Sequence, residues 1–136
     1  MQCKYGNLLL IFCLCLLSSS LLAQSKQELK EEAKAYLAVE RYEDAIRTLQ
    51  RSRQLVRSDE ESRFLLAVCH YQINQLEQSQ ELLNALTAED KSPYPECWWY
   101  LARILHAQQQ FGEAAAQYKM YLRTLRGDHP NRPMTI

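Results

Sequence analysis

The feature that most constrains the fold of this chain is a pattern that recurs three times, at intervals of 34 and 35 residues. Each copy has a small residue, with a large apolar residue three positions before it, another four positions after it, and an alanine twelve positions before it. The small residues are Ala45, Ser79 and Ala114, and the preceding alanines are Ala33, Ala67 and Ala102. A period of this length is typical of stacked supersecondary units, which bury a continuous core only together.

The repeating units are predicted to be helical hairpins. Beyond the first 23 positions, apolar residues recur at steps of three and four, as in Leu29, Ala33 and Leu37, and no segment alternates apolar with polar residues. Two antiparallel helices approach closely where both carry small residues, and bulky side chains one turn away fill the flanking space. We therefore expect an all-α protein in which Ala33 faces Ala45 at a helix crossing.

These residues resemble the tetratricopeptide repeat, a helix–turn–helix family with about 34 residues in each repeat. The third copy is the most similar, and its matching residues are Trp98, Leu101, Ala102, Leu105, Phe111, Ala114, Tyr118 and Tyr121. The second copy matches at Leu66, Ala67, His70, Leu76, Ser79 and Leu83, and the first at Leu29, Ala33, Tyr36, Tyr42, Ala45 and Leu49. The chain departs from the family at Glu32, where leucine is preferred, and at Arg57, where the family has proline. The resemblance covers Lys26 to about Arg126.

The resemblance implies an all-α, right-handed helical-repeat solenoid of three hairpins, or six helices. The expected helix pairs are 26–39 with 42–56, 60–73 with 76–87, and 95–109 with 111–125. They form repeats of about 26–59, 60–93 and 95–126 in one domain, residues 24–126, which an irregular tail follows at residues 127–136. Ser92 and Pro95 suit the start of the fifth helix, and Gly127 suits a cap after the sixth.

The resemblance also implies a binding face, because the first helix of each pair lines a concave groove in this family. The residues predicted to contact a partner there are Lys30, Lys34, Phe64, Val68, Tyr71, Gln72, Trp99, Arg103 and His106. Helical spacing independently places Phe64, Val68 and Tyr71 on one face of the expected helix 60–73. It likewise places Trp99, Arg103 and His106 on one face of the expected helix 95–109. Aromatic residues with an arginine beside them are common in binding hot spots. The alternative is that these aromatics pack against neighbouring repeats as core.

The cationic side chains outside this predicted binding face do not indicate a second binding site. Arg47, Arg51, Arg53 and Arg57 lie on the second predicted helix in two pairs that diverge around it, which favours a solvated convex face over an anion site. Some members of the family grip a carboxyl terminus with lysines and asparagines on the first helices. The asparagines are missing from those helices here, so we do not predict that clamp.

The first 23 residues have the layout of a cleavable secretory signal peptide. A polar start with Lys4 precedes the apolar run Leu8–Leu17, three serines, and a small residue, Ala23, before the expected cut. The alternative of a membrane anchor is disfavoured, because Leu8–Ala23 is shorter than the roughly 20 apolar residues of a span. Lipidation is disfavoured as well, since Cys13 and Cys15 follow bulky residues.

Cleavage after Ala23 leaves 15 Lys+Arg against 16 Asp+Glu, and this balance argues against a nucleic-acid partner and against an anionic membrane surface. Two cysteines, Cys69 and Cys97, remain. Their repeat positions place them about 10 Å apart along parallel helices, which favours buried free thiols over a disulfide.

Neither catalysis nor metal binding finds support in the pattern. The adjacent Cys69 and His70 point to different helix faces, four zinc ligands cannot be assembled, and no nucleophile motif is present. We therefore expect a non-enzymatic protein–protein interaction scaffold of the cell envelope, periplasmic or secreted, which binds a peptide or protein segment in its groove and needs no cofactor. The alternative is an assembly module, or part of a larger envelope protein, joined through exposed array ends that include Tyr118, Tyr121 and Leu122.

Overall fold

The computed structural model describes residues 25–88 and 92–126. Helices follow one another at residues 25–38, α2 Tyr42–Gln50, α3 Arg53–Ser58, α4 Glu60–Gln72, α5 Leu76–Leu86, α6 Glu96–Ala107 and α7 Phe111–Arg126. These ranges contain no strand, so the all-α, helical-repeat prediction is confirmed. The predicted signal peptide, the tail at residues 127–136 and the expected Gly127 cap lie outside the described residues.

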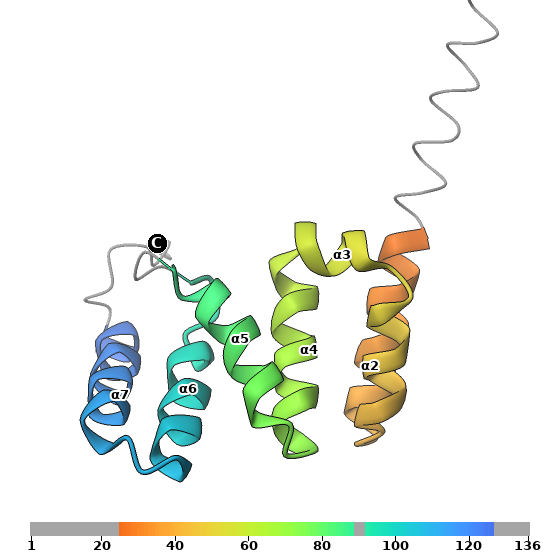
Figure 1. Cartoon of the computed structure of the whole chain (residues 1–136). Coiled ribbons are helices and arrows are strands. Elements are labelled where there is room, and N and C mark those ends of the chain that lie inside the picture. The colour runs from red at the N-terminus through yellow and green to blue at the C-terminus, as the bar shows by residue number, and fades with distance from the viewer. Residues whose placement is uncertain (1–24, 89–91, 127–136) are drawn as a thin grey trace, which may run out of the picture.

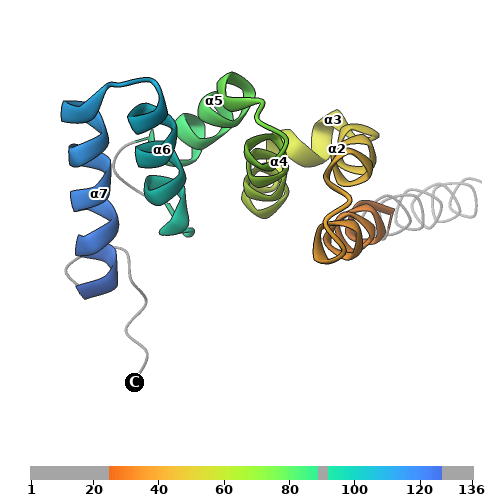
Figure 2. The same cartoon turned by 90° about the horizontal axis from the view of Figure 1, so that it is seen from below.

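The helices stand side by side in chain order, from the helix at residues 25–38 and α2 at one end to α7 at the other (Figure 1). Turned by 90°, the same array shows α4 and α6 on one side of the row and α5 on the other (Figure 2). The first helices of the three hairpins therefore share one face of the molecule. This is the side on which the binding residues were predicted.

Small residues mark the crossings inside each hairpin, as the repeat pattern predicts. Ala33 and Ala45 are both buried in the first core cluster, and Ala102 and Ala114 are buried in the third hairpin. The second hairpin has a serine at this position, where the Ser79 hydroxyl donates a 2.8 Å hydrogen bond to the backbone carbonyl of Ala67 on α4. A buried hydroxyl is tolerated because this bond satisfies it.

The three hairpin turns are built alike, although none of them contains glycine. Glu40, Asn74 and Gln109 each adopt a positive φ of about 60° directly after a first helix. The next residue donates its N–H to a carbonyl five positions earlier, as from Gln75 to His70 at 2.8 Å. This is the Schellman pattern, which uses carbonyls that the end of a helix leaves without partners.

The first hairpin contradicts one expectation, because the predicted helix 42–56 is interrupted. It ends at Gln50 and α3 begins at Arg53, so the second helix of this repeat is two short helices. Ser52 separates them, since its side chain accepts a 3.2 Å hydrogen bond from the N–H of Leu55 and caps α3. The Arg63 guanidinium donates to the carbonyls of Val56 and Arg57 at the other end of α3. The residues between Leu49 and Leu55 are all polar, so the apolar pattern that predicted one helix has a gap where the cap divides it.

The start of the third hairpin also differs in detail. α6 begins at Glu96, and Pro95 in the capping position provides no side-chain hydrogen bond. Ser92, expected at the helix start, instead accepts a 3.1 Å bond from the N–H of Tyr94 within the preceding turn. Its hydroxyl also lies 3.6 Å from the Cys97 sulfur. Ser92 therefore shapes the turn that holds Tyr94 rather than capping α6.

Candidate partner-binding face

Aromatic rings from α4, α6 and the turn before α6 form a continuous ladder. Phe64 stacks flat on Tyr94, with ring centroids 4.7 Å apart, and meets the edge of Tyr100 at 6.3 Å. Tyr100 also contacts Tyr71 at 5.0 Å and Trp99 at 4.9 Å, both in edge-to-face geometry. Such pairs stabilise beyond the area they bury, by about 0.5–1.5 kcal/mol each. Tyr100 is therefore the centre of this aromatic ladder.

Arg103 lies at the exposed end of the ladder. Its guanidinium carbon is 4.8 Å from the Trp99 ring centre and 5.9 Å from that of Tyr71, distances typical of cation–π contacts. Among the described residues it forms no ion pair within 4 Å, and its side chain is exposed. The rings hold the cation in place and leave its hydrogen-bond donors for a ligand.

Two open hollows flank Arg103. One, of about 390 Å³, is lined by Tyr71, Gln72, Asn74, Leu76, Arg103, Ile104 and Ala107. The other, of about 310 Å³, lies toward α7 and is lined by Arg103, His106, Ala107 and Tyr118. Volumes of this size accommodate one or two side chains of a bound polypeptide. Arg103 can therefore meet an acidic group whose neighbours enter either hollow.

The predicted residues of the second and third repeats are brought together only in part. Tyr71, Gln72, Trp99 and Arg103 lie at these hollows or at the exposed end of the ladder. His106 is exposed and touches the edge of Phe111, with centroids 5.3 Å apart. Val68 keeps only 8% of its surface exposed, so it has little to offer a partner. Phe64 packs against core residues and supports the ladder from below, which is the core alternative raised for it.

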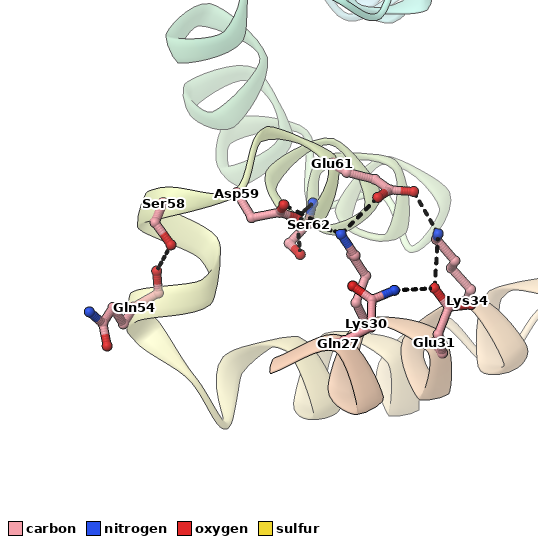
Figure 3. Close-up of polar contacts among 9 residues, drawn as sticks. All are labelled: Gln27, Lys30, Glu31, Lys34, Gln54, Ser58, Asp59, Glu61 and Ser62. Carbon is pink, nitrogen blue, oxygen red and sulfur yellow. Dashed lines mark hydrogen bonds and ion pairs between the residues drawn. The ribbon is translucent and has the colours of Figure 1, made fainter. Parts of the chain in front are cut away.

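The two predicted lysines of the first repeat have partners within the molecule (Figure 3). The Lys30 ammonium lies 2.9 Å from a Glu61 carboxylate oxygen and 3.4 Å from an oxygen of Asp59. The Lys34 ammonium lies 2.6 Å from the other Glu61 oxygen. We call Lys30, Lys34, Asp59 and Glu61 the ionic clamp, because they join the helix at residues 25–38 to α4. Two lysines that the sequence offered as partner contacts thus hold the array together.

The pKa values of the clamp residues move in the directions that these contacts require. Hydrogen bonds from Lys34 and Lys30 lower the pKa of Glu61, and the hydrogen bond to Glu61 raises the pKa of each lysine. Burial works to raise the pKa of Asp59, but hydrogen bonds from Ser62 and the charge of Lys30 outweigh it, and the net pKa is lowered. Asp59 also caps α4, accepting a 2.8 Å bond from the N–H of Ser62. All four groups are therefore charged at neutral pH.

Comparison with known families adds an independent finding. Two sequence models of the tetratricopeptide repeat match the chain, one over residues 36–98 and the other over residues 70–130. Together they span more than half of its 136 residues. The chain belongs to the tetratricopeptide repeat family. No curated protein matches it.

Family membership confirms the resemblance read from the repeat pattern, and tetratricopeptide repeats in general form protein–protein interaction modules. Sequence reasoning missed two members of the ladder, Tyr94 and Tyr100. Tyr100 stands beside the two tryptophans and could have been suspected from the aromatic run at 98–100. Tyr94 lies in the linker, and only the turn around Ser92 brings its ring onto Phe64. No sequence signal marked that contact.

The remaining sequence predictions can be placed as well. Cys69 and Cys97 are both buried and free, as expected, and burial raises their thiol pKa values to about 11 and about 12. No group of three or more His, Cys, Asp or Glu side chains suited to a metal occurs in residues 25–88 and 92–126. A search of the same residues finds no helix long and apolar enough to cross a membrane.

Another hollow, of about 540 Å³, lies beside the break between α2 and α3 and contains no residue of the aromatic ladder. It is lined by Gln50, Arg53, Val56, Arg57 and Leu66. Arg53 and Arg57 are exposed at its edge. We place the candidate site at Arg103 instead, because there a cation without a carboxylate partner, exposed aromatic surface and two hollows coincide.

Proposed function

We propose that this protein is a non-enzymatic scaffold that binds a peptide or protein segment along α4 and α6. The observation that carries the proposal is Arg103, held over Trp99 and Tyr71 between two hollows with no carboxylate partner among the described residues. A guanidinium fixed on aromatic faces binds carboxylates with little loss of side-chain entropy. The aromatic surface beside it supplies area for an apolar side chain.

The chemistry of this face favours a segment with an acidic residue next to an aromatic or aliphatic one. Arg103 would receive the carboxylate, and the hollow lined by Tyr71 and Leu76 would receive the apolar side chain. Gln72 and Asn74 at the same hollow can hydrogen-bond the backbone of the segment. The first repeat contributes little directly, because its lysines are held in the ionic clamp.

We also propose that the protein acts outside the cytoplasm, in the periplasm or as a secreted protein. The support is the sequence of residues 1–23, whose polar start, apolar run and small residue before the expected cut are the layout of a cleavable signal peptide. The test is to express the full chain in a bacterium and measure the mass and N-terminus of the product. We expect it to begin at Gln24 in the extracytoplasmic fraction, and an intact N-terminus in the cytoplasm would overturn this part of the proposal.

The binding proposal is tested with the mature chain, residues 24–136, and a random 12-residue peptide library displayed on phage. Peptides selected on the protein are synthesised and titrated by isothermal calorimetry against the wild type, Trp99→Ala and Arg103→Ala. Arg57→Ala, which changes an exposed arginine of α3 that forms no described contact with a ring of the ladder, is the matched control. We expect selected peptides to pair an acidic with an apolar residue.

Trp99→Ala and Arg103→Ala each remove a side chain that would contact the peptide. Each should weaken binding about 10-fold or more, which corresponds to at least about 1.4 kcal/mol. The control should bind as the wild type does. Selected peptides that bind all variants equally would exclude α4 and α6 as the site. Unfolding curves of each variant separate a binding defect from a folding defect.

A further inference from the structure

The exposed large hydrophobic residues of the described chain all lie at the two ends of the array. At one end is Val39, 63% exposed, directly after the helix at residues 25–38. At the other end are Phe111, Leu122 and Leu125 of α7, which are 59%, 49% and 53% exposed. Side chains of this size in water are commonly parts of interaction surfaces when they share one face.

On α7 the exposed residues do share a face. The positions 111, 115, 118, 122 and 125 alternate steps of four and three, which keeps them on one side of a helix. They are Phe111, Ala115, Tyr118, Leu122 and Leu125, and we call them the tail face. A different side of α7, with Ala114 and Thr124, is buried. Most of the tail face therefore lies outside the packing of α7 within its own hairpin, and its contact with α6 is the ring of Phe111 against His106.

A matching surface lies at the other end of the array, on the helix at residues 25–38. Glu28 and Ala35 are exposed on one side of that helix, with the half-buried Glu32 between them, and the exposed Val39 follows directly after the helix. We call these four residues the head face. It carries carboxylates in its first half and small or aliphatic side chains in its second half.

The two faces correspond to the two sides of a joint that the molecule already contains. Leu83 and Leu86 of α5 pack with Cys97, Leu101 and Ile104 of α6 in one buried cluster. Leu76 of α5 also packs against this cluster. One repeat further along the chain, Leu76 corresponds to Phe111 and Leu83 to Tyr118. Two repeats earlier, Cys97, Leu101 and Ile104 correspond to Glu28, Glu32 and Ala35. The positions that hold α6 on α5 inside the array are therefore occupied by Glu28, Glu32 and Ala35 in the head face and by Phe111 and Tyr118 in the tail face.

The charges of the two faces are complementary in that arrangement. α5 and α6 run in opposite directions (Figure 1), so a helix added in the same way would place its beginning beside the end of α7. Glu28 would then lie near Lys119 and Arg126, which are exposed along the border of the tail face. Glu32 is already paired with Arg51 of α2 at 3.3 Å, so the complementary charge of the head face comes mainly from Glu28. Val39 would lie near Phe111. Opposite charges placed in this way favour the pairing and fix its direction.

From these observations we propose that copies of this chain associate head to tail, with the head face of one copy on the tail face of the next. The interface repeats the α5–α6 joint between molecules and so extends the array. It is heterologous, and therefore each copy keeps one face free for a further copy. This inference concerns the array ends and does not require a ligand at Arg103, although Tyr118 of the tail face also lines one of the two hollows there.

The contact is expected to be weaker than the joint inside the molecule. Glu28 and Glu32 stand where α6 has the buried Cys97 and Leu101, and a carboxylate is costly to desolvate. A dissociation constant on the order of 100 µM is therefore expected for the head-to-tail contact. It should weaken several-fold when the salt concentration rises from about 50 to 300 mM, because the charged rim is screened.

The test uses the mature chain, residues 24–136, and two variants that each block one end. The head variant is Glu28→Lys with Ala35→Lys, and the tail variant is Leu122→Glu with Leu125→Glu. All four side chains are exposed, so the fold should be retained, and circular dichroism with thermal unfolding checks this. Sedimentation equilibrium over a range of concentrations gives the average mass. We expect the wild type to exceed the monomer mass and each variant alone to remain a monomer.

The mixture of the two variants provides the sharpest result. The tail variant keeps an intact head face and the head variant keeps an intact tail face, so an equimolar mixture should form a 1:1 dimer and nothing larger. Three results would overturn the proposal: a wild type that stays monomeric, a mixture that stays monomeric, or a head variant that still associates by itself. The last result would mean tail-to-tail pairing.

Discussion

The two joints between first helices on the predicted binding side differ sharply. Between the helix at residues 25–38 and α4, the side chains form the ionic clamp, in which Glu61 bridges two lysines (Figure 3). Between α4 and α6, the equivalent region is the aromatic ladder, which ends in Arg103. Charges in the first joint are satisfied internally, whereas the second joint leaves a cation and ring surface for another molecule. A shared repeat position therefore does not imply a shared role.

Within the aromatic ladder, the rings that pack against the core differ from the residues at its exposed end, which could contact a partner. Phe64 and Tyr100 contact other rings, and both pack against core residues. Arg103 and the outer ring Trp99 lie at the exposed end. Burial raises the pKa of the Tyr100 phenol above its usual value of 10, which is consistent with its place inside the ladder. Stability and binding should therefore respond to different residues, and four predictions test that division.

The largest expected effect is at the supporting ring. Phe64→Ala removes the stack on Tyr94 and the edge contact with Tyr100, and we expect a loss of about 3 kcal/mol in the free energy of unfolding. Urea unfolding followed by circular dichroism measures it. Phe111→Ala, which removes a ring that is 59% exposed, is the control and should cost less than about 1 kcal/mol. Equal losses in the two variants would show that Phe64 does not support the ladder.

The next effect tests the ionic clamp. Glu61→Gln keeps the shape of the side chain but removes the charge that both lysines contact, and we expect a loss of about 1 kcal/mol at neutral pH. The value is modest because a third of the Glu61 side chain is exposed. Glu60→Gln is the matched control, one residue away, exposed and without a described ion pair. If both variants were as stable as the wild type, the clamp would contribute nothing to stability.

The ionic clamp should also make the free energy of unfolding depend on pH in the acidic range. The folded pKa of Glu61 lies below its ordinary value of 4.5, so its contribution is fully present above pH 4.5 and is lost as the pH falls through the lowered folded value. The difference in unfolding free energy between wild type and Glu61→Gln should therefore be constant near neutrality and shrink below pH 4.5. Urea unfolding at a series of pH values checks this. A difference that persists unchanged in acid would contradict an electrostatic origin.

The smallest expected effect is at the recognition end. Arg103→Ala removes an exposed side chain whose described contacts are two ring faces, and we expect the free energy of unfolding to change by less than about 0.5–1 kcal/mol. The same variant should lose most of its affinity for the peptide, whereas the main effect expected of Phe64→Ala is on stability. Thermal unfolding beside calorimetric titration gives both quantities. A large stability loss would move Arg103 from the binding face to the structural support.

The sequence predicted much of this fold because the signals concerned are local or periodic. Small residues at Ala33, Ala45 and their counterparts fixed where helices cross, and steps of three and four fixed which side of each helix is buried. The exception in helix 42–56 shows the limit of periodicity. Every residue between Leu49 and Leu55 is polar, and within this stretch the Ser52 hydroxyl accepts a hydrogen bond from the backbone of Leu55 and begins a new helix.

The sequence by itself determined the repeat, the all-helical hairpins and the side of the array on which Trp99 and Arg103 lie. The tertiary structure decided which of the predicted binding side chains are free. Lys30 and Lys34 lie on the predicted binding side, yet both are paired with Glu61 of α4. Tyr94 joins the ladder only through a turn in the linker. Both outcomes depend on distances between segments far apart in the chain, and a pattern of spacing along one helix carries no information about them.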